Sequence, residues 1–191
     1  MDHGFIPPAT LQDDQVITPD ESPLKIYLAG FDVFRLDAVE HGEHLKELCR
    51  SHRFDGLYPL DAVVDSTLDP TARATWIFES NIAAIRRCDV VMANLADFRG
   101  AGEPDAGTAF EVGFAVAAGK LVFGYMPDTQ PLTHRVRKAG GDSVSPVCDR
   151  GYLIENFDLP VNLMLACATT IVHGGPEACL HAISKHLGMT V

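Results

Sequence analysis

The sequence lacks the features that mark several common classes of protein. Its 15 Lys and Arg residues are outnumbered by 26 Asp and Glu residues, giving a net charge of −11, and no basic run occurs. This balance argues against binding to the phosphate backbone of nucleic acids, which clustered Lys and Arg side chains hold. No stretch reaches the roughly 18 apolar residues of a membrane span. We therefore expect a small or weakly charged ligand, with no nucleic acid and no membrane as partner.

Cysteine and histidine occur, but without the spacing that disulfide frameworks or metal sites need. Five cysteines form no C-x-x-C pair, and eight histidines form neither H-x-x-x-H nor H-E-x-x-H. This spacing favours reduced thiols and predicts no metal site. Residues 1–23 contain neither the basic segment nor the long apolar core of a secretory leader. Together these absences predict a cytoplasmic protein.

Two motifs for phosphate-bearing ligands are also missing. No G-x-G-x-x-G follows the first predicted strand, and no G-x-x-x-x-G-K-[ST] occurs. Neither a dinucleotide site nor a P-loop is supported, and we expect no cofactor.

What the sequence does contain is a regular alternation of strands and helices. Short apolar runs predict buried strands at residues 25–30, 54–60, 89–95 and 120–126. Apolar spacing and end signals predict helices at residues 36–52, 70–88, 106–119, 161–175 and 176–188. Because parallel strands need crossover connections, this order predicts an α/β fold with one doubly wound parallel sheet, Rossmann-like or flavodoxin-like, flanked by helices.

The length of 191 residues suits a single domain. Residues 1–23, rich in Pro and Asp, are expected to form an N-terminal arm that is mobile or laid over a neighbour, ahead of a domain at 24–191. Residues 127–158 are polar and rich in Gly and Pro. A loop of that length in a compact domain is more often a lid or a binding loop than filler.

One stretch, "PDAGTAFEVGFAVAAGK" at residues 104–120, places two carboxylates at the mouth of an apolar helix. Thr108 followed by Glu111 matches the S/T-x-x-E capping box, in which both side chains accept helix N–H groups. Alternatively, Glu111 is an ionised nucleophile held at a helix N-terminus. Ligands of doubly wound sheets sit outside the carboxyl ends of the strands, where Asp105 and Glu111 are predicted to lie, and this favours chemistry.

Three blocks of the sequence resemble the nucleoside 2-deoxyribosyltransferases. They are "KIYLAGFDVF", "NIAAIRRCDVVMANLADFRGAGEPDAGTAFEVGFAVAAGK" and "LIENFDLPVNLML", they follow the family order, and they cover most of residues 24–166. The most specific signals are D-x-G-x-x-x-E-[LV]-G-[FY]-A around Glu111 and N-L-M at residues 162–164. The resemblance implies transfer of 2-deoxyribose between nucleobases, with deoxyribonucleosides and free bases as partners.

The same resemblance implies roles for individual side chains. Glu111 is the nucleophile, Tyr27 orients its carboxylate, and Asp105 binds a sugar hydroxyl or lies near the base. Asn162 and Met164 reach into a neighbouring subunit's site, which implies a homo-oligomer, either a dimer or a hexamer. The structural alternatives are a core tyrosine, a turn-forming aspartate, a capping asparagine and a buried methionine.

The remaining substrate-binding candidates are Gly30, Phe31, Asn81, Asn94 and Gly107. Asn81 stands where some members of the family carry an aspartate. An amide donates and accepts hydrogen bonds but supplies no titratable proton. The general acid for departure of the base is therefore left open between Asp105, water and the basic nitrogen of a purine.

Two other functions fit the resemblance. A deoxynucleoside 5′-monophosphate N-glycosidase would need a phosphate cradle after the first strand, and "GFDVFRLDA" offers bulky Phe31 and Phe34, acidic Asp32 and only Arg35. A non-catalytic nucleoside-binding domain would keep the pocket and release no product. The choice between purine and pyrimidine depends on the pocket and on residues 127–158.

Overall fold

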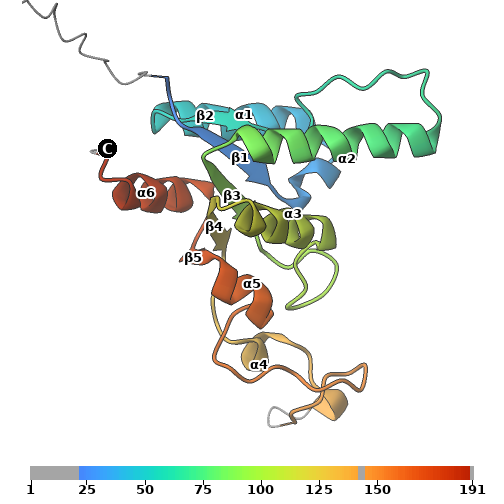
Figure 1. The fold of residues 1–191 in the computed structure, drawn as a ribbon. Coiled ribbons are helices and arrows are strands. Elements are labelled where there is room, and N and C mark those ends of the chain that lie inside the picture. Colours follow the sequence, from blue (N-terminus) through green and yellow to red (C-terminus); the bar gives the residue numbers. More distant parts are fainter. Residues whose placement is uncertain (1–21, 142–144, 190–191) are drawn as a thin grey trace, which may run out of the picture.

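The computed structural model describes residues 22–141 and 145–189, and the predicted arm lies almost wholly outside them. Its centre is a sheet of five parallel strands in the order β2-β1-β3-β4-β5 (Figure 1). The strands are β1 Lys25–Ala29, β2 Asp55–Leu57, β3 Val90–Asn94, β4 Leu121–Met126 and β5 Thr170–His173. This is the flavodoxin-like order, and it confirms the predicted fold class.

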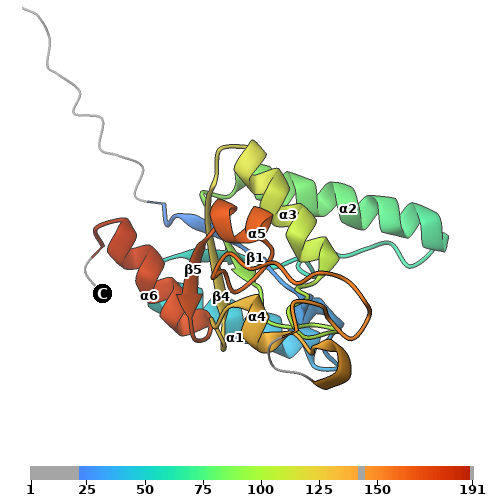
Figure 2. The same ribbon diagram turned by 90° about the horizontal axis from the view of Figure 1, so that it is seen from below.

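Side chains that alternate along the strands enter two separate cores. Ile26 and Leu28 of β1 pack with α1 and α6, whereas Tyr27 and Ala29 pack with α2 and α3. Figure 2 shows the two layers of helices from a second direction. The helices on the first face are α1 Ala38–Ser51 and α6 Pro176–His186. Those on the second face are α2 Pro70–Arg87, α3 Ala106–Ala117 and α5 Leu163–Ala168.

The ends of α2 follow the sequence signals. Asp69 is the N-cap, and its Oδ1 accepts hydrogen bonds from the backbone N–H groups of Thr71 and Ala72 at 2.9 and 3.0 Å. Pro70 opens the helix, where its fixed φ and missing N–H cost nothing.

The prediction of one helix at residues 161–175 is wrong. The segment holds the short helix α5 and then the edge strand β5, which pairs with β4 from Phe123↔Thr170 to Met126↔His173. The run Thr169–Val172 is β-branched throughout, and such side chains favour a pleated, half-buried surface. The second predicted helix of this region is confirmed as α6.

In the described part of residues 127–158, the helical elements are α4 Leu132–Arg135 and the 3₁₀ turn η2 Ala139–Gly141. The Arg135 side chain is 6% exposed and donates to the carbonyl of Pro160 and to the Asp97 carboxylate. This arginine therefore ties the loop after β3 to the segment that leads into α5. Within residues 22–141 and 145–189, no helix is both long and apolar enough to cross a membrane.

Candidate active site

A cavity of about 330 Å3 opens at the carboxyl edge of the sheet, next to the ends of β1 and β2 and the start of α3. One half is polar and includes Asn81, Asp105, Thr108 and Glu111. The other half is apolar and is made by Val33, Phe34, Pro59, Leu60 and Ile77. Gly30 and Gly107 complete the wall. A ring system and a polar sugar would each find a matching half.

The polar half is centred on Glu111, whose carboxylate is held by Tyr27 of β1. Tyr27 points from β1 into the α2–α3 layer, is fully buried, and donates its hydroxyl to Glu111 Oε1 at 2.6 Å. Asn81 Nδ2 on α2 approaches the same oxygen at 3.5 Å, a weak contact. Both contacts use Oε1, and no hydrogen bond to Oε2 is seen among the described residues, while Glu111 itself lines the cavity.

Burial sets the protonation of this pair. Removal from water raises the pKa of Glu111 from its ordinary 4.5 to about 7; the Tyr27 hydrogen bond acts against this rise, and the charge of Asp105 adds to it. Burial and the neighbouring Glu111 raise the pKa of the Tyr27 phenol, which therefore stays protonated and donates. Glu111 is thus a carboxyl group that changes charge near neutral pH.

The capping-box interpretation of Glu111 is wrong. The helix begins at Ala106, and its N-cap is Asp105, whose Oδ2 accepts from the backbone N–H and the hydroxyl of Thr108 at 2.9 and 3.1 Å. Thr108 is therefore a donor in the first turn, and Glu111 lies one turn further on, bonded to Tyr27. The carboxylate of Glu111 caps nothing.

Two glycines of the predicted site lie where a larger residue would collide with the cavity wall. A Cβ at Gly107 would come within 2.9 Å of Asp105 Oδ2. A Cβ at Gly30 would come within 2.7 Å of Asp32 Oδ2 and 2.9 Å of Asn94 Cβ. Both positions bring backbone close to the space that a ligand would fill.

Phe31 and Asn94 are not among the residues that line the cavity. Phe98 stacks on both Phe31 and Phe34, with ring centroids 5.0 and 5.3 Å apart, and only Phe34 of these three rings reaches the cavity wall. Asn94 is 7% exposed and turns away, donating to Asp32 Oδ2 at 2.9 Å. Residues 127–158 contribute nothing to the described lining of this cavity.

Asn162 and Met164 lie apart from Glu111 within the chain. Asn162 caps α5, accepting from the Met164 N–H at 3.0 Å, and the Met164 side chain is 72% exposed. Both line a second groove of about 680 Å3, on the face of α3 that carries Ala109, Val112 and Val116. The capping alternative for Asn162 is confirmed, and the buried alternative for Met164 is wrong.

Sequence reasoning missed the apolar half of the cavity. Val33, Phe34, Pro59 and Leu60 belong to short connections, where apolar residues have no periodic signal. Ile77 could have been predicted to line the cavity, because it lies one helical turn before Asn81 on the same face of α2.

No cluster of metal-binding side chains occurs in the described parts of the chain. The five cysteines are free thiols. The chemistry available at the cavity is therefore that of carboxylates, an amide and a phenol.

Comparison with known proteins identifies the family of the chain. The sequence model of a family described as nucleoside 2-deoxyribosyltransferase matches residues 26–164, which include Tyr27, Asn81, Asp105 and Glu111. The chain belongs to this family of 2-deoxyribosyltransferases. The predicted resemblance is thereby confirmed.

Three similar proteins differ in how closely they match this chain. A 2-desoxiribosyltransferase from Leishmania mexicana has 34% identity and a TM-score of 0.70, covering 86% of this chain and 99% of its own. An uncharacterized protein of Schizosaccharomyces pombe is 33% identical over 146 residues, 72% of this chain and 69% of the relative. A conserved protein from Enterococcus faecalis V583, at 21% identity and a TM-score of 0.56, covers 86% of this chain and 99% of its own and supports the fold alone.

Proposed function

We propose that this 2-deoxyribosyltransferase family member moves 2-deoxyribose from one nucleobase to another, with Glu111 as nucleophile. The observation that carries the proposal is a carboxylate at a cavity, held through one oxygen by a buried tyrosine, with no hydrogen bond to its other oxygen among the described residues. The apolar half of the cavity suits the flat face of a base, and the polar half suits the sugar hydroxyls. A deoxyribonucleoside and a free base are the two substrates.

The reaction proceeds in two displacements. Glu111 Oε2 attacks C1′ on the face opposite the base, the C–N glycosidic bond breaks, and the departing base takes the electron pair and a proton. The acceptor base then attacks C1′ with a ring nitrogen, releases the Glu111 carboxylate and loses a proton. Two inversions give net retention. Tyr27 keeps the carboxylate oriented, and its hydrogen bond favours the ionised form that attacks.

The proton for the departing base does not come from Asn81, whose amide has none to give. Asp105 lines the cavity, but its Oδ2 already accepts two hydrogen bonds from Thr108 and serves as the cap of α3. Two possibilities remain for this proton. A purine can accept it at its own basic nitrogen, or a water molecule can donate it to the departing base. We therefore favour purine donors over pyrimidine donors.

The segment after β1 favours nucleosides over nucleoside monophosphates. Arg35 forms two hydrogen bonds with Asp37, at 2.8 and 2.9 Å, and Asp32 is buried against Asn94. Phe34, from the same segment, lines the cavity. A phosphate here would face an occupied arginine and a nearby carboxylate, which disfavours the N-glycosidase alternative.

The proposal includes assembly into a dimer or a hexamer. Asn162 and Met164 are exposed or half-exposed at the second groove and lie away from Glu111 of their own chain. In the assembly, Asn162 of one subunit contacts the sugar, and Met164 contacts the ring, in a neighbour's cavity.

The test is incubation with deoxyinosine, with and without adenine, for the wild type and Glu111→Gln, with chromatography of the products. We expect adenine-dependent formation of deoxyadenosine, and loss of at least about a thousandfold in rate for the variant, since losing about 4 kcal/mol of transition-state stabilisation costs that much. Mass spectrometry should find a 2-deoxyribosyl adduct on the peptide that contains Glu111. Equal hypoxanthine release without adenine, with deoxyinosine 5′-monophosphate as the better donor, would establish the hydrolase instead. Binding without any product would indicate a non-catalytic domain.

A further inference from the structure

We propose that Asp32 is a positioning residue that holds the apolar half of the cavity in place and so sets the affinity for the base. Asp32 does not line the cavity. It acts through the residues on either side of it, through the end of β3 and through helix α1. The kinetic part of this inference rests on the proposed function, and its structural part does not.

Asp32 is a buried carboxylate at a junction of three elements. It lies in the 3₁₀ turn η1 Phe31–Phe34 and is 6% exposed. Its Oδ2 accepts a hydrogen bond from Asn94 Nδ2 at the end of β3, at 2.9 Å. Its Oδ1 lies 3.2 Å from His41 Nε2 on α1. A buried carboxylate with partners on both oxygens fixes their relative positions, because losing any partner leaves a charge without compensation.

The turn that Asp32 fixes supplies three residues of the cavity wall. Gly30 precedes it, and Val33 and Phe34 follow it. The approach is close, since a Cβ on Gly30 would meet both Asp32 Oδ2 and Asn94. Gly30 therefore leaves no room for a side chain between the cavity wall and the Asp32–Asn94 pair.

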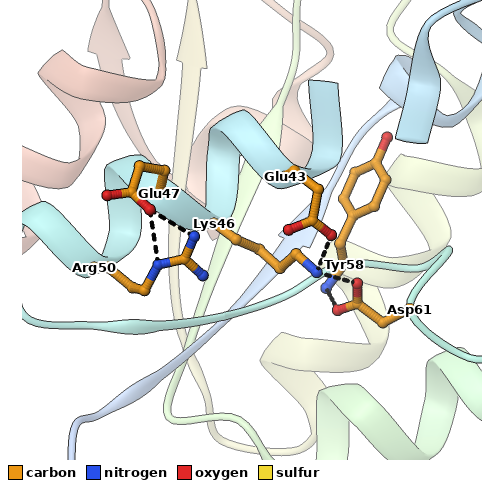
Figure 3. A network of polar contacts seen from close by, with 6 residues as sticks. All are labelled: Glu43, Lys46, Glu47, Arg50, Tyr58 and Asp61. Carbon is orange, nitrogen blue, oxygen red and sulfur yellow. Dashed lines mark hydrogen bonds and ion pairs between the residues drawn. The ribbon is translucent and has the colours of Figure 1, made fainter. Parts of the chain in front are cut away.

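A second part of the wall, Pro59 and Leu60, follows Tyr58 and is tied to α1, the helix whose His41 contacts Asp32. Tyr58 packs its ring on Gly42 of α1, next to His41, and burial together with the charge of Asp32 raises the pKa of Tyr58 to about 12. Figure 3 shows how this segment is tied to α1: the Tyr58 N–H donates to Asp61 at 2.8 Å, and Lys46 bridges Asp61 and Glu43 at 2.6 and 2.7 Å.

The apolar half and the polar half of the cavity are therefore held in place by different side chains. Tyr27 and Asn81 hold Glu111, whereas Asp32, Asn94 and His41 hold the wall that a base would contact. A change at Asp32 should weaken base binding and leave the chemical step nearly intact. This separation distinguishes a positioning role from a general structural one.

The experiment compares Asp32→Asn with Asp37→Asn, a matched control on an exposed neighbour whose partner is Arg35. For Asp32→Asn we expect KM for deoxyinosine to rise about tenfold with kcat within about threefold of wild type, as for loss of one charge-assisted hydrogen bond. The control should keep both constants. The exchanged pair Asp32→Asn with Asn94→Asp restores a donor facing an acceptor and should recover most of the lost affinity.

Amide hydrogen exchange supplies a readout that does not depend on catalysis. In Asp32→Asn, exchange should quicken in residues 30–34, 58–61 and 94–96 and stay unchanged in α3. If Asp32→Asn does not fold, Asn94→Ala removes the same hydrogen bond from the other side and should give the same pattern.

An unchanged KM, an equal fall in kcat and kcat/KM, or exchange quickened evenly over the whole sheet would each overturn the inference. If the wild type transfers no deoxyribose, the proposed function fails by itself. The exchange pattern then decides the role of Asp32.

Discussion

Glu111 combines two properties that oppose each other, a buried position and a need for charge. In the proposed reaction, attack on C1′ requires the carboxylate, whereas burial raises the pKa of Glu111 to about 7. Glu111 is therefore protonated in a large fraction of molecules at neutral pH. The developing positive charge of an oxocarbenium-like transition state compensates this, because it favours the ionised form beside it.

The rate should therefore depend on pH through Glu111. The attacking form is the ionised one, so kcat/KM for deoxyinosine should rise from pH 5.5, pass a midpoint near the pKa of about 7, and level off above pH 8. Below this midpoint, kcat/KM should decrease by close to tenfold for each unit by which the pH is lowered. A profile that is flat between pH 5.5 and 8 would contradict this assignment.

The same pKa shift predicts a stability cost that Glu111→Gln should remove. A carboxyl whose folded pKa lies above its unfolded 4.5 destabilises the fold as pH rises from about 4.5 to 7, the window in which only the unfolded state ionises freely. Gln keeps the acceptor for Tyr27 without the charge. The free energy of unfolding of Glu111→Gln relative to wild type should therefore increase by about 2 kcal/mol between pH 5 and pH 8. Denaturant titrations at the two pH values measure this, and an unchanged difference would show that Glu111 titrates normally.

Tyr27→Phe should separate orientation from packing. The ring stays in the core, but the hydrogen bond that lowers the pKa of Glu111 is lost, so the midpoint of the pH profile should move above that of wild type. At pH 8 the rate should fall about tenfold, as for loss of a hydrogen bond to a charged group. Tyr125→Phe is the matched control, since Tyr125 is buried in the other core. A lower rate with an unmoved midpoint would indicate that Tyr27 acts by packing alone.

Only part of this chemistry could be predicted residue by residue. Period-two alternation puts Tyr27 on the opposite face from Ile26 and Leu28, but it does not say which helix the phenol meets. The pairing with Glu111 was implied by the family resemblance. Phe34 and Leu60 escaped because a single apolar residue in a turn gives the same pattern whether it packs inside or lines a cavity.

At the scale of elements, the start of α3 shows how two local signals compete. Asp105 lies three residues before Thr108, and Thr108 lies three residues before Glu111, so the sequence offers two overlapping N-caps. The structure uses the first, with Asp105 as cap. The second fails because the Glu111 side chain bonds to Tyr27 across the layer. Local pattern alone has no access to that long-range contact.

Asp105 variants should distinguish a cap from an acid. Asp105→Ala should lower the free energy of unfolding by about 1 kcal/mol, the usual cost of losing an N-cap. Asp105→Asn keeps a capping oxygen and should leave stability nearly unchanged. If Asp105 only caps α3, the Asn variant should retain most of the transfer rate. A hundredfold loss of kcat in a stable Asn variant would identify Asp105 as the proton donor or as a contact to the substrate.

The last third of the chain marks the limit of element prediction. Asn162 and the following apolar residues predicted one helix, yet α5 ends at Ala168 and β5 begins at Thr170. A four-residue strand at an edge is too short for a clear period-two signal, and its hydrogen bonds come from β4. The other four strands were recoverable because each lies within a predicted apolar segment of six or seven residues that is followed by a helix or a loop.

At the scale of the whole molecule, the proposed assembly makes a test by mixing possible. Glu111→Ala supplies a chain with an intact Asn162, and Asn162→Ala supplies a chain with an intact Glu111. If Asn162 completes a neighbouring site, mixed oligomers contain some sites with both groups and should recover up to about a quarter to a half of wild-type activity, whereas each variant alone stays low. The mixture is assayed after subunit exchange. A fully active wild-type monomer at high dilution would exclude this arrangement.

The sheet order also links catalysis to the completion of folding. The hydroxyl of Tyr27 and the carboxylate of Glu111 are 84 residues apart in the chain, and α3 packs on both β1 and β3, which lie side by side. A nascent chain that has released only β1, α1 and β2 contains no part of the nucleophile. A misfolded form in which β2 pairs with β1 but β3 is displaced would contain both Tyr27 and Glu111. It would still lack the hydrogen bond between them. In a cell extract, the proposed activity would therefore come only from molecules with a complete sheet. Activity relative to total protein would then report the fraction that is misfolded, in addition to the level of expression.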